Sequence, residues 1–557
     1  MIPLQDFQKR PRVLVAGGGL TAWETAAQVL KLGYEVVLAT PAGLVQPVRS
    51  LQPSDQALGG YVSGLLEQLK QHSKGWIIEG AQVTAIDGFA GDFQVELAGA
   101  DRSWNEAVGA IVLAPELSSK GPGSTVPQEA SRTGITLDRL AEAFAVPDQA
   151  PEAFRSLGPD SYVALVSGLN GSGGLAEMAQ ALSGALKIRE EIGSQVYFFT
   201  GNIKVAEEGL ERLYLACRDA GVVFFKFEEE QPEFLVRNER PIIRFVDPLV
   251  GRSLELGPDL LITEEVHVLP EKMQALAEEA RLGLDRSGFL QPANIHLLPY
   301  QTMREGIFTA GPGKGPLTPP SALEEARGAA LAVHHFFQGR EVEPGDREVV
   351  VDKGLCTVCL TCLRFCPHQA IGWTHRVFIH PLACRRCGIC ASECPMDAIQ
   401  IAGYSDAEVE NRLAEIGTRW GEPAASGLRI VIFGCQRSAG TAWEQAQSAE
   451  RQELDAKKPT LSEVEFIGLP CAGKLDTDAL LKALTQGADG VLVLACPEEN
   501  CRSQQGNTYA RRRLGEARDY LEEAGLDPGR LRFAALSSNM VHKMHEIIDR
   551  FVEDLKR

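Results

Sequence analysis

The chain has 557 residues and a net charge of -19, and 44% of its residues are hydrophobic. This length exceeds one hydrophobic core, so we expect three or four domains. The acidic balance excludes non-specific nucleic-acid binding and direct docking on an anionic membrane, since both need a basic face. No apolar run approaches the roughly 20 residues of a membrane-spanning helix, and no signal peptide precedes the first strand-like run. We therefore expect a cytoplasmic chain that reaches the inner face of a membrane only through partner subunits.

Residues 12–40 predict the opening of a doubly wound α/β domain, because a β-branched strand, a glycine-rich turn, a helix and a second strand follow one another. The turn reads G-x-G-x-x-A. Gly17 permits the tight turn, Gly19 lets the backbone approach a pyrophosphate, and Ala22 allows close helix–strand packing. Thr40 replaces the acid that commonly binds ribose. Either the ADP-ribose is held differently, or the glycines only pack. The candidate cofactor contacts here are Gly17, Gly19, Leu20, Thr21, Ala22 and Thr40.

Residues 161–200 repeat this pattern and predict a second α/β unit of the nucleotide-binding type. The polar stretch 117–135 is expected to be a loop. Residues 306–315, GIFTAGPGKG, resemble the segment that closes the flavin site in two-dinucleotide-domain flavoproteins. That resemblance implies cofactor contacts at Gly311 and Gly315, and a cation at Lys314 near a flavin. The alternative for this lysine is a solvated loop position.

The cysteine count is the most informative feature of the composition. Twelve of the thirteen cysteines lie between Cys356 and Cys501, and only Cys217 lies outside. A disulfide scaffold is short, secreted and evenly stapled, so this pattern instead indicates a reduced compartment and metal ligation.

Eight of these cysteines form two copies of the C-x2-C-x2-C-x3-C-P arrangement within residues 350–402, which binds [4Fe–4S] clusters. The fourth cysteine of each run reaches the other cluster. Zinc prefers two CxxC pairs with a longer gap, which makes it the weaker alternative. The module relays electrons and performs no bond chemistry itself. We expect one cluster on Cys356, Cys359, Cys362 and Cys394, and a second on Cys384, Cys387, Cys390 and Cys366.

The remaining cysteines follow predicted strands of a C-terminal α/β domain that begins near Leu428. Carboxyl ends of parallel strands share one edge of a sheet, so these thiols can meet there. Four thiols suit a [2Fe–2S] cluster or a tetrahedral zinc ion, and the alternative is a set of buried small hydrophobes. They are Cys435, Cys471, Cys496 and Cys501. A helix over 405–418 is expected on the surface before this domain, with Ser405 as its N-cap.

Taken together, these parts resemble the A subunit of heterodisulfide reductase, with the delta subunit of the methyl-viologen-reducing hydrogenase fused to its C-terminal end. The delta-like features include the segments FGC, PCAG and VLVLACPEENC. Gly434 and Ser438 stand where that family often has further cysteines. The stretch 166–178 lacks the cysteines that carry an extra cluster in the heterodisulfide reductase family. The combination is most similar to the B subunit of the quinone-interacting membrane-bound oxidoreductase complex.

The resulting prediction is a multidomain α/β protein. We expect an FAD-binding two-dinucleotide-domain flavoprotein region at 1–345, an inserted two-cluster α+β ferredoxin domain at 346–404, a linker helix at 405–427, and a small parallel-sheet delta-subunit-like domain at 428–557.

The resemblance implies an oxidoreductase subunit with FAD, two [4Fe–4S] clusters and a further [2Fe–2S] cluster. It implies transfer of electrons between a quinone-side partner and a soluble reductase of the adenylylsulfate type in sulfur metabolism. Its partners would be a flavoprotein paralogue, a membrane quinone-reactive subunit and a soluble electron carrier protein. The alternatives are a component of a flavin-based electron-bifurcating complex and a non-catalytic wiring scaffold. No acid–base pair or nucleophile triad stands out, so we assign no catalytic residue.

Overall fold

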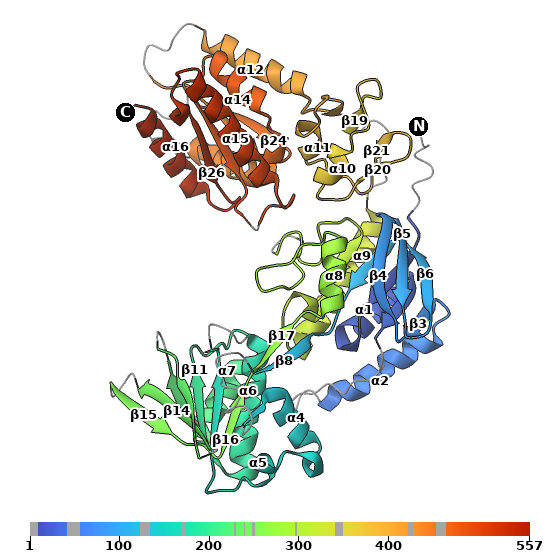
Figure 1. Ribbon diagram of the computed structural model, residues 1–557, viewed down its shortest axis with the longest axis vertical. Helices are drawn as coiled ribbons and strands as arrows, with labels where there is room; N and C mark the ends of the chain where they lie inside the picture. Colours follow the sequence, from blue (N-terminus) through green and yellow to red (C-terminus); the bar gives the residue numbers. More distant parts are fainter. Residues whose placement is uncertain are drawn as a thin grey trace.

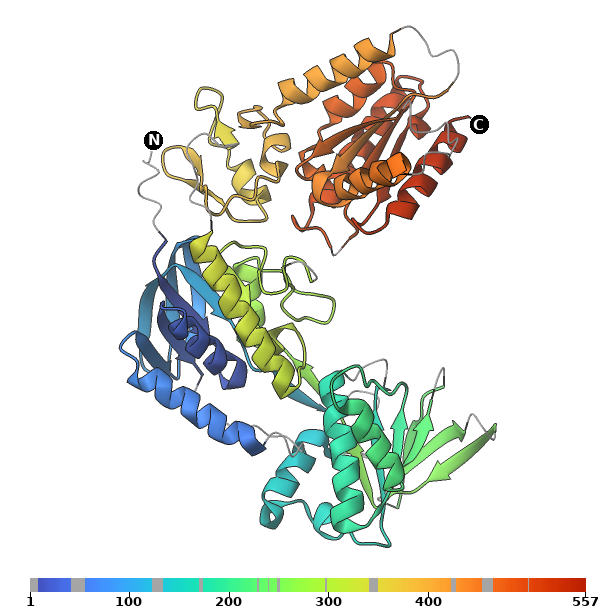
Figure 2. The same ribbon diagram turned by 180° about the vertical axis from the view of Figure 1, so that it is seen from behind.

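The computed structural model describes residues 9–41, 56–122, 134–169, 174–227, 230–238, 240–247, 251–295, 298–339, 349–421, 427–452, 464–498 and 500–556. Figure 1 shows its parts arranged along one axis. A second α/β unit lies at one end, the first α/β unit lies in the middle, and the cysteine module and C-terminal domain lie at the other end. Figure 2 shows the same order from behind. No helix among the described residues is long and apolar enough to cross a bilayer.

The first α/β unit is built on a parallel sheet in the order β18-β7-β1-β2-β3. Its central strands are almost fully buried because helices cover one face and an antiparallel sheet from residues 82–108 packs on the other, as the apolar run at 12–16 predicts. The strand order reverses beside β1, where open α/β sheets bind ligands. Its elements are β1 (Arg12–Ala16), α1 (Gly19–Lys31), β2 (Glu35–Thr40), α2 (Gln56–Gln71), β3 (Gly75–Glu79), β7 (Ala110–Leu113), α8 (Glu271–Glu279), β18 (Ile307–Thr309) and α9 (Pro319–Gln338), with an antiparallel sheet of β4 (Gln82–Phe89), β5 (Asp92–Ala98) and β6 (Ser103–Val108).

The second α/β unit is inserted within the first and has the same kind of parallel sheet, in the order β12-β11-β10-β16-β9. A two-stranded antiparallel ribbon, β8 with β17, joins the units. The prediction of a loop over 117–135 is therefore wrong at β8 and β9. These short, largely polar edge strands lack the apolar alternation by which a strand is recognised in a sequence. Residues 123–133 lie outside the described ranges. The elements are β8 (Ser118–Pro122), β9 (Gly134–Thr136), α4 (Leu137–Ala145), α5 (Glu152–Arg155), β10 (Tyr162–Ser167), α6 (Leu175–Lys187), β11 (Gln195–Thr200), α7 (Leu210–Asp219), β12 (Val223–Lys226), β13 (Glu233–Arg237), β14 (Arg240–Asp247), β15 (Arg252–Leu256), β16 (Leu260–Thr263) and β17 (Glu265–Val268).

The cysteine module packs directly on the first α/β unit, and the two share one hydrophobic core. Phe89 stacks on His380 with ring centroids 4.7 Å apart. Arg385 donates hydrogen bonds to Glu305 and to the Thr302 carbonyl, at 2.8 and 3.0 Å. The module is therefore held to the first unit by side chains as well as by the chain. Its elements are β19 (Val349–Val351), α10 (Thr361–Phe365), β20 (Ile371–Trp373), β21 (Val377–Ile379), α11 (Ile389–Ser392) and β22 (Ile399–Ile401).

The helix α12 (Asp406–Trp420) begins as expected, with Ser405 and Glu408 forming a reciprocal capping box. Its description as a linker helix needs correction. Val409, Leu413 and Ile416 lie at helical spacing and are buried in the core of the C-terminal domain. The helix therefore belongs to that domain, and residues 422–426 of the expected linker lie outside the described ranges.

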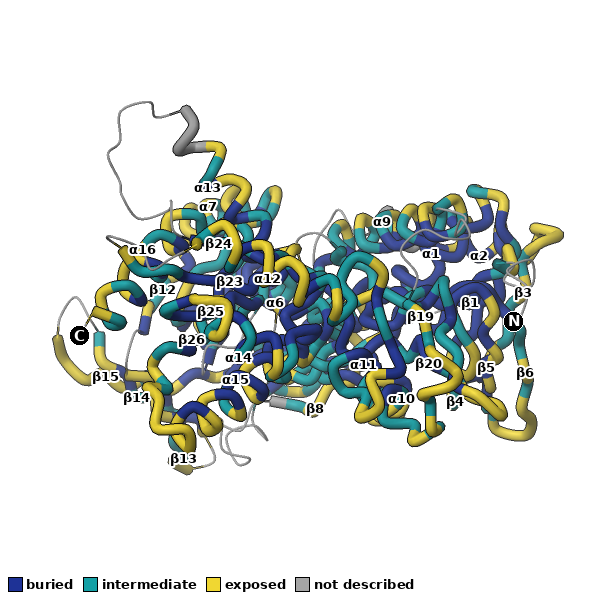
Figure 3. Tube along the Cα trace, turned by 90° about the horizontal axis from the view of Figure 1, so that it is seen from above, coloured by how far each residue is buried: buried dark blue, intermediate teal, exposed yellow. Residues whose placement is uncertain are grey.

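The C-terminal domain is a four-stranded, wholly parallel sheet in the order β24-β23-β25-β26, as the alternating strand and helix pattern predicts. Buried apolar clusters line both faces of this sheet. Figure 3, coloured by burial, shows the central strands β23 and β25 largely buried. The elements are β23 (Ile430–Cys435), α13 (Thr441–Gln452), β24 (Val464–Leu469), α14 (Thr477–Thr485), β25 (Gly490–Ala495), α15 (Gly506–Glu523), β26 (Leu531–Ala535) and α16 (Val541–Leu555).

Candidate functional site

The glycine turn between β1 and α1 has the close packing that the sequence predicts. Gly17 has φ 154° and Gly19 has φ 81°. A Cβ on Gly17 would lie 1.8 Å from the carbonyl oxygen of Ala114, at the end of β7. Gly18 caps α1 without a side-chain hydrogen bond, and the first turn of α1 contains no acid. The turn therefore leaves the positive end of α1 uncapped, which is what a pyrophosphate site requires.

Thr40 lies at the end of β2 beside this turn and is fully buried. Its hydroxyl is 3.4 Å from the position of a Cβ on Gly18 and donates to the Pro41 carbonyl at 3.3 Å. The position is that of the ribose-binding acid, but the hydroxyl offers one hydrogen bond where a carboxylate would offer two.

The structure adds a residue that the sequence motifs do not reveal. Glu116 follows β7, and its Oε1 lies 1.9 Å from the position of a Cβ on Gly19. The side chain is open to solvent on one side, and desolvation by the surrounding protein raises its pKa to about 7. The sequence signal was an acid directly after the apolar run 110–114, which places Glu116 at the strand end beside the glycine turn.

The segment after β18 closes over α1. Gly311 has φ 69°, and a Cβ there would lie 2.4 Å from the Thr21 hydroxyl. Gly315 has φ 129° in the turn before α9. Lys314 does not point freely into this space: it pairs with Glu325 and donates to the Pro299 carbonyl at 3.0 Å, with 14% of its side chain exposed. Its charge is already matched within the protein.

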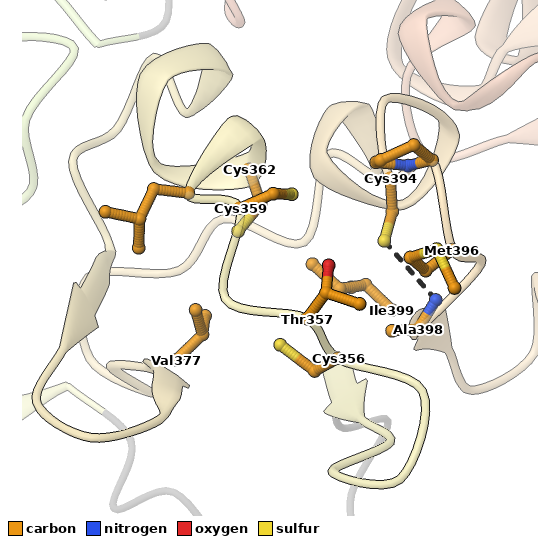
Figure 4. Close-up of a pocket in the computed structure, with 11 residues that line it drawn as sticks. Cys356, Thr357, Cys359, Cys362, Val377, Cys394, Met396, Ala398 and Ile399 are labelled. Atoms are coloured by element: carbon orange, nitrogen blue, oxygen red, sulfur yellow. Dashed lines mark hydrogen bonds between the residues drawn. The ribbon is translucent and has the colours of Figure 1, made fainter.

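The first set of module thiols lines one cavity, as Figure 4 shows. The rest of the lining is mainly apolar, from Leu360, Val377, Met396 and Ile399. Three thiols come from the first cysteine run and one from the second. Cys394, the fourth cysteine of the second run, thus lies with the first three cysteines of the other run. The set, called thiol set one below, is Cys356, Cys359, Cys362 and Cys394.

A second cavity is lined by the other four module thiols, together with His368, Arg385 and Arg386. Burial raises the pKa of Cys384 to about 11 and that of Cys387 to about 12. An isolated thiol here would stay protonated, so a positively charged centre is needed to hold it as a ligand. The set, called thiol set two, is Cys366, Cys384, Cys387 and Cys390.

The two halves of the module repeat each other in backbone detail. Positive φ occurs at three pairs of positions, each pair separated by the same number of residues: Val358 and Arg386, Leu360 and Gly388, Gln369 and Asp397. The amides of Ala370 and Ala398 donate to Cys366 and Cys394 sulfurs, at 3.4 and 3.3 Å. Such turned loops aim N–H groups at the sulfurs, which suits an anionic iron–sulfur cluster.

The four C-terminal thiols come together at the carboxyl edge of the parallel sheet. The sulfurs of Cys435 and Cys496 are 3.6 Å apart. Hydrogen bonds from Cys471 and Cys496 lower the pKa of Cys501, and a hydrogen bond from Cys496 lowers that of Cys435 to about 6. The thiols that follow the strands thus lie together, as the parallel order predicts. The set is called the C-terminal thiol set: Cys435, Cys471, Cys496 and Cys501.

Two neighbours shape this set. A Cβ on Gly506, at the start of α15, would lie 2.4 Å from the Cys471 sulfur and 3.4 Å from that of Cys501. The helix therefore points its positive end at the thiols. Ser438, where the resemblance places a further cysteine, lies 3.4 Å from the Cys496 sulfur. By contrast, Gly434 packs against Phe466, whose ring would meet an added Cβ at 2.3 Å.

Thiol set two and the C-terminal thiol set are neighbours. Burial raises the pKa of Cys387, and a hydrogen bond with Ser503 of the C-terminal domain opposes the rise. A Cβ on Gly506 would lie 3.5 Å from Ser503 as well as against the C-terminal thiols. One serine side chain thus stands between the two sets.

A crevice of about 520 Å³ opens where the first α/β unit, the module and the C-terminal domain meet. It is lined by Arg281 of the first unit, Cys366 of the module and Tyr509 of the C-terminal domain, among others. Tyr509 also contacts Phe365, with ring centroids 5.4 Å apart.

Among the described residues, no group of three His, Cys, Asp or Glu side chains is close enough to hold a single metal ion.

Comparison with known proteins agrees with these parts. The family described as methyl-viologen-reducing hydrogenase, delta subunit, matches residues 430–557, and a 4Fe-4S binding domain matches residues 377–400. The chain is 24% identical over 379 residues to the A subunit of the ferredoxin:CoB-CoM heterodisulfide reductase of Methanosarcina mazei, which is 68% of this chain and 46% of that protein.

A further relative is the A subunit of the H(2)/formate:CoB-CoM heterodisulfide,ferredoxin reductase of Methanococcus maripaludis. It is 30% identical over 192 residues, covering 33% of this chain and 28% of that protein. The chain thus spans less than half the length of these curated relatives. Among solved structures, the thioredoxin reductase of T. acidophilum covers 59% of the chain at 14% identity, with a TM-score of 0.43.

The chain joins two parallel-sheet α/β units, of the kind that bind dinucleotides, to a 4Fe-4S binding domain. More particularly, it is similar to the A subunit of heterodisulfide reductase over about two thirds of its length, and it carries a fused domain of the hydrogenase delta-subunit family.

Proposed function

We propose that this chain is the electron-transfer subunit of a larger redox complex, with its centres in the order flavin, module clusters, C-terminal centre. The observation that carries the proposal is the adjacency of thiol set two and the C-terminal thiol set, separated by Ser503. Iron–sulfur clusters pass single electrons over short distances without forming or breaking bonds to a substrate. The protein's part is to hold the centres close together and away from water.

Each module thiol set would hold one [4Fe–4S] cluster. Four thiols facing one cavity, mainly apolar walls and amides that donate to sulfur match the ligand chemistry of such clusters. The exchange of Cys366 and Cys394 between the runs ties the two halves of the module together. The C-terminal thiol set would hold a [2Fe–2S] cluster, because it lies beside another thiol set rather than alone. Tetrahedral zinc is the other occupant that four thiols suit.

FAD would bind the first α/β unit across the glycine turn. Gly17, Gly19 and the uncapped end of α1 would receive the pyrophosphate. Leu20, Thr21 and Ala22 form the helix start, where Thr21 packs against Gly311, and Gly315 would contact the cofactor from the turn before α9. Thr40 would hydrogen-bond the ribose. Lys314 would act indirectly, by fixing the closing segment through Glu325. When bound, a flavin exchanges one or two electrons and so can join two-electron donors to one-electron clusters.

The finer assignment rests on the resemblance to the B subunit of the quinone-interacting membrane-bound oxidoreductase complex. In that role the chain would connect a membrane quinone-reactive subunit and a flavoprotein paralogue with a soluble reductase of the adenylylsulfate type, at the inner face of the membrane. The alternative is a component of an electron-bifurcating complex. One relative, from Methanothermobacter marburgensis, is named as an H(2):CoB-CoM heterodisulfide,ferredoxin reductase subunit. Its name combines one electron donor with two acceptors, which is the combination that electron bifurcation uses. Co-purification from native cells with quinone-reactive or with hydrogenase subunits decides between them.

The ligand assignment is tested with the anaerobically purified full chain. Replacing Cys394 with Ser should remove a cluster from set one, and Cys366→Ser a cluster from set two, each losing about four irons per chain. Cys217→Ala is the matched control, because Cys217 is buried outside all three sets and donates to the Leu182 carbonyl at 3.2 Å. Full zinc occupancy with little iron, or equal iron in all variants, contradicts the assignment.

A wiring scaffold without flavin is the second candidate, and two observations favour it: Thr40 in place of an acid, and Glu116 over Gly19. Flavin content separates the two. A flavin near one per chain supports the electron-transfer subunit as proposed, and flavin near zero with full iron supports the scaffold.

A further inference from the structure

The two halves of the module differ in charge at matched positions. The residue after the first cysteine is Thr357 in set one and Arg385 in set two. The second residue after the last cysteine is Met396 in one half and His368 in the other. The residue after Thr357 is Val358, and the residue after Arg385 is Arg386, which also lines the cavity of set two. Since the backbone of the two halves repeats so closely, these side chains distinguish the two cavities.

Among the described residues, no charged side chain lines the cavity of thiol set one other than the cysteines themselves. Glu393 precedes Cys394, but it is engaged by Arg512 and Arg513 of the C-terminal domain. The described surroundings of set one are therefore close to neutral.

Thiol set two has guanidinium groups on several sides. Arg385 lines the cavity, and 6% of its side chain is exposed. Its Nε donates to Glu305, and one Nη donates to the Thr302 carbonyl. The other Nη is buried and has no hydrogen-bond partner among the described residues. Arg281 lines the crevice that Cys366 also borders, and it donates to the Arg364 carbonyl at 3.2 Å. His368 adds no charge, because burial lowers its pKa to about 3.

The C-terminal domain adds two more arginines, Arg502 and Arg437, whose charges act on His368 in the wall of this cavity. The Nε of Arg502 is buried and has no hydrogen-bond partner in the part of the chain that the structure describes. Desolvation, followed by the nearby Arg437 and Arg385, lowers the pKa of Arg502 to about 10, so it stays charged at neutral pH. Glu305 is the acid that faces this group, which leaves an excess of positive charge.

We propose that Arg385, Arg437 and Arg502 stabilise the reduced form of the cluster on thiol set two, making it the more easily reduced of the two module clusters. The inference rests on the proposed function and deepens it. Reduction adds one negative charge to a buried centre, which desolvation opposes and fixed guanidinium charges favour. Arg385 is buried and Arg502 is half-buried, so water screens their charges less than that of Arg437, which is exposed. An electron in the module is therefore held beside the C-terminal thiol set rather than at set one.

The test is an EPR-monitored redox titration of the full, iron-loaded chain. Arg385→Gln should lower the reduction potential of the cluster that gives the more easily reduced [4Fe–4S] signal. At a fixed potential, the ratio of reduced to oxidised cluster should fall about tenfold, which corresponds to a shift of about 59 mV for one electron. The other signal should stay unchanged. Arg385→Lys keeps the charge and should restore most of the shift. Thr357→Val, the matched position at set one, should leave the more easily reduced signal unchanged.

Arg385 also anchors the module to the first unit, so Arg502→Gln serves as a second variant without that anchoring role. It should shift the same signal in the same direction. Equal shifts of both signals, or none in Arg385→Gln and Arg502→Gln, would overturn the inference. Iron and sulfide contents measured on the same samples test the proposed function separately: normal contents with no selective shift reject only the inference, and missing clusters reject the function.

Discussion

The two α/β units have five-stranded parallel sheets that match in strand order except at one edge strand. They differ in what surrounds the start of the helix after the central strand, which is α1 in the first unit and α6 in the second. In the first unit, the end of α1 has no capping side chain and no acid in its first turn. In the second, Glu264 accepts hydrogen bonds from the Ser167 hydroxyl and the Gly168 amide, at 3.0 and 2.9 Å. Glu177 likewise accepts from the Gly174 amide at 2.8 Å. Both units have backbone amides at the start of this helix. In the second unit glutamate side chains accept hydrogen bonds from amides there, whereas at α1 no capping side chain does so.

The largest expected effect is on flavin binding in the first unit. Gly19→Val would place a branched side chain where Glu116 and the pyrophosphate approach, at a φ that disfavours it. We expect flavin affinity to fall by roughly a hundredfold or more. Fluorescence titration measures it. Gly174→Ala at the start of α6 is the control and should leave affinity unchanged; an equal loss there would mean that the two helix starts do not differ as described.

The acids of the second unit also create a pH dependence. The carboxylates of Asp138 and Glu177, which lie 3.9 and 3.4 Å from the His267 ring nitrogens, raise the pKa of His267 to about 10. A group with a raised pKa stabilises the fold below its unfolded value near 6.5, and this stabilisation is lost as pH rises towards 10. We expect His267→Gln to lose stability on the order of a few kcal/mol at pH 6, with the difference vanishing near pH 10. Hydrogen exchange of α6 across this range measures it, and a pH-independent difference contradicts it.

Two glutamates make a matched pair for stability. Glu264 is buried and bonded, whereas Glu116 is solvent-exposed and has no hydrogen bond among the described contacts. Glu264→Ala leaves buried donors unpaired and should cost about 1–3 kcal/mol of unfolding free energy. Glu116→Ala should cost about 0.5 kcal/mol or less. Urea denaturation of both variants measures the two losses of unfolding free energy. Similar losses would contradict the hydrogen bonds that Glu264 accepts from Ser167 and Gly168.

The smallest expected effect concerns the acid in the first unit. The Glu116 carboxylate lies over the turn that would receive the pyrophosphate. Glu116→Gln removes a competing negative charge at the helix end, so flavin should bind about fivefold more tightly, worth about 1 kcal/mol. Weaker binding would instead mean that Glu116 contacts the cofactor favourably. The Glu264→Gln variant is the control.

Periodicity and motif spacing predicted the main elements, because they depend on local sequence. The runs before Gly17, Cys435 and Cys496 are buried parallel strands, and parallel strands bring their carboxyl ends to one edge. This is why the four C-terminal thiols could be placed together without knowing any contact. The two cysteine runs predicted which fourth thiol crosses over, for the same geometric reason.

The remainder depends on contacts between distant parts of the chain. The ion pair of Lys314 with Glu325 and the position of Glu116 over Gly19 follow from how neighbouring elements pack. Ser503 beside Cys387 depends on the docking of two domains. The apolar face of α12 was visible in the sequence, but its partner was not, so the helix was described as a linker.

The shared hydrophobic core of the first α/β unit and the module has a mechanical consequence. Parts that share a core move as one body, so the separation between the glycine turn and the two module cavities is fixed by the fold. The second unit is joined to this body through the ribbon of β8 and β17. Hydrogen bonds from Thr318 and Ser321 to Glu207 also join the two units. The second unit lies away from the module (Figure 1), so a shift in its position would leave that separation unchanged.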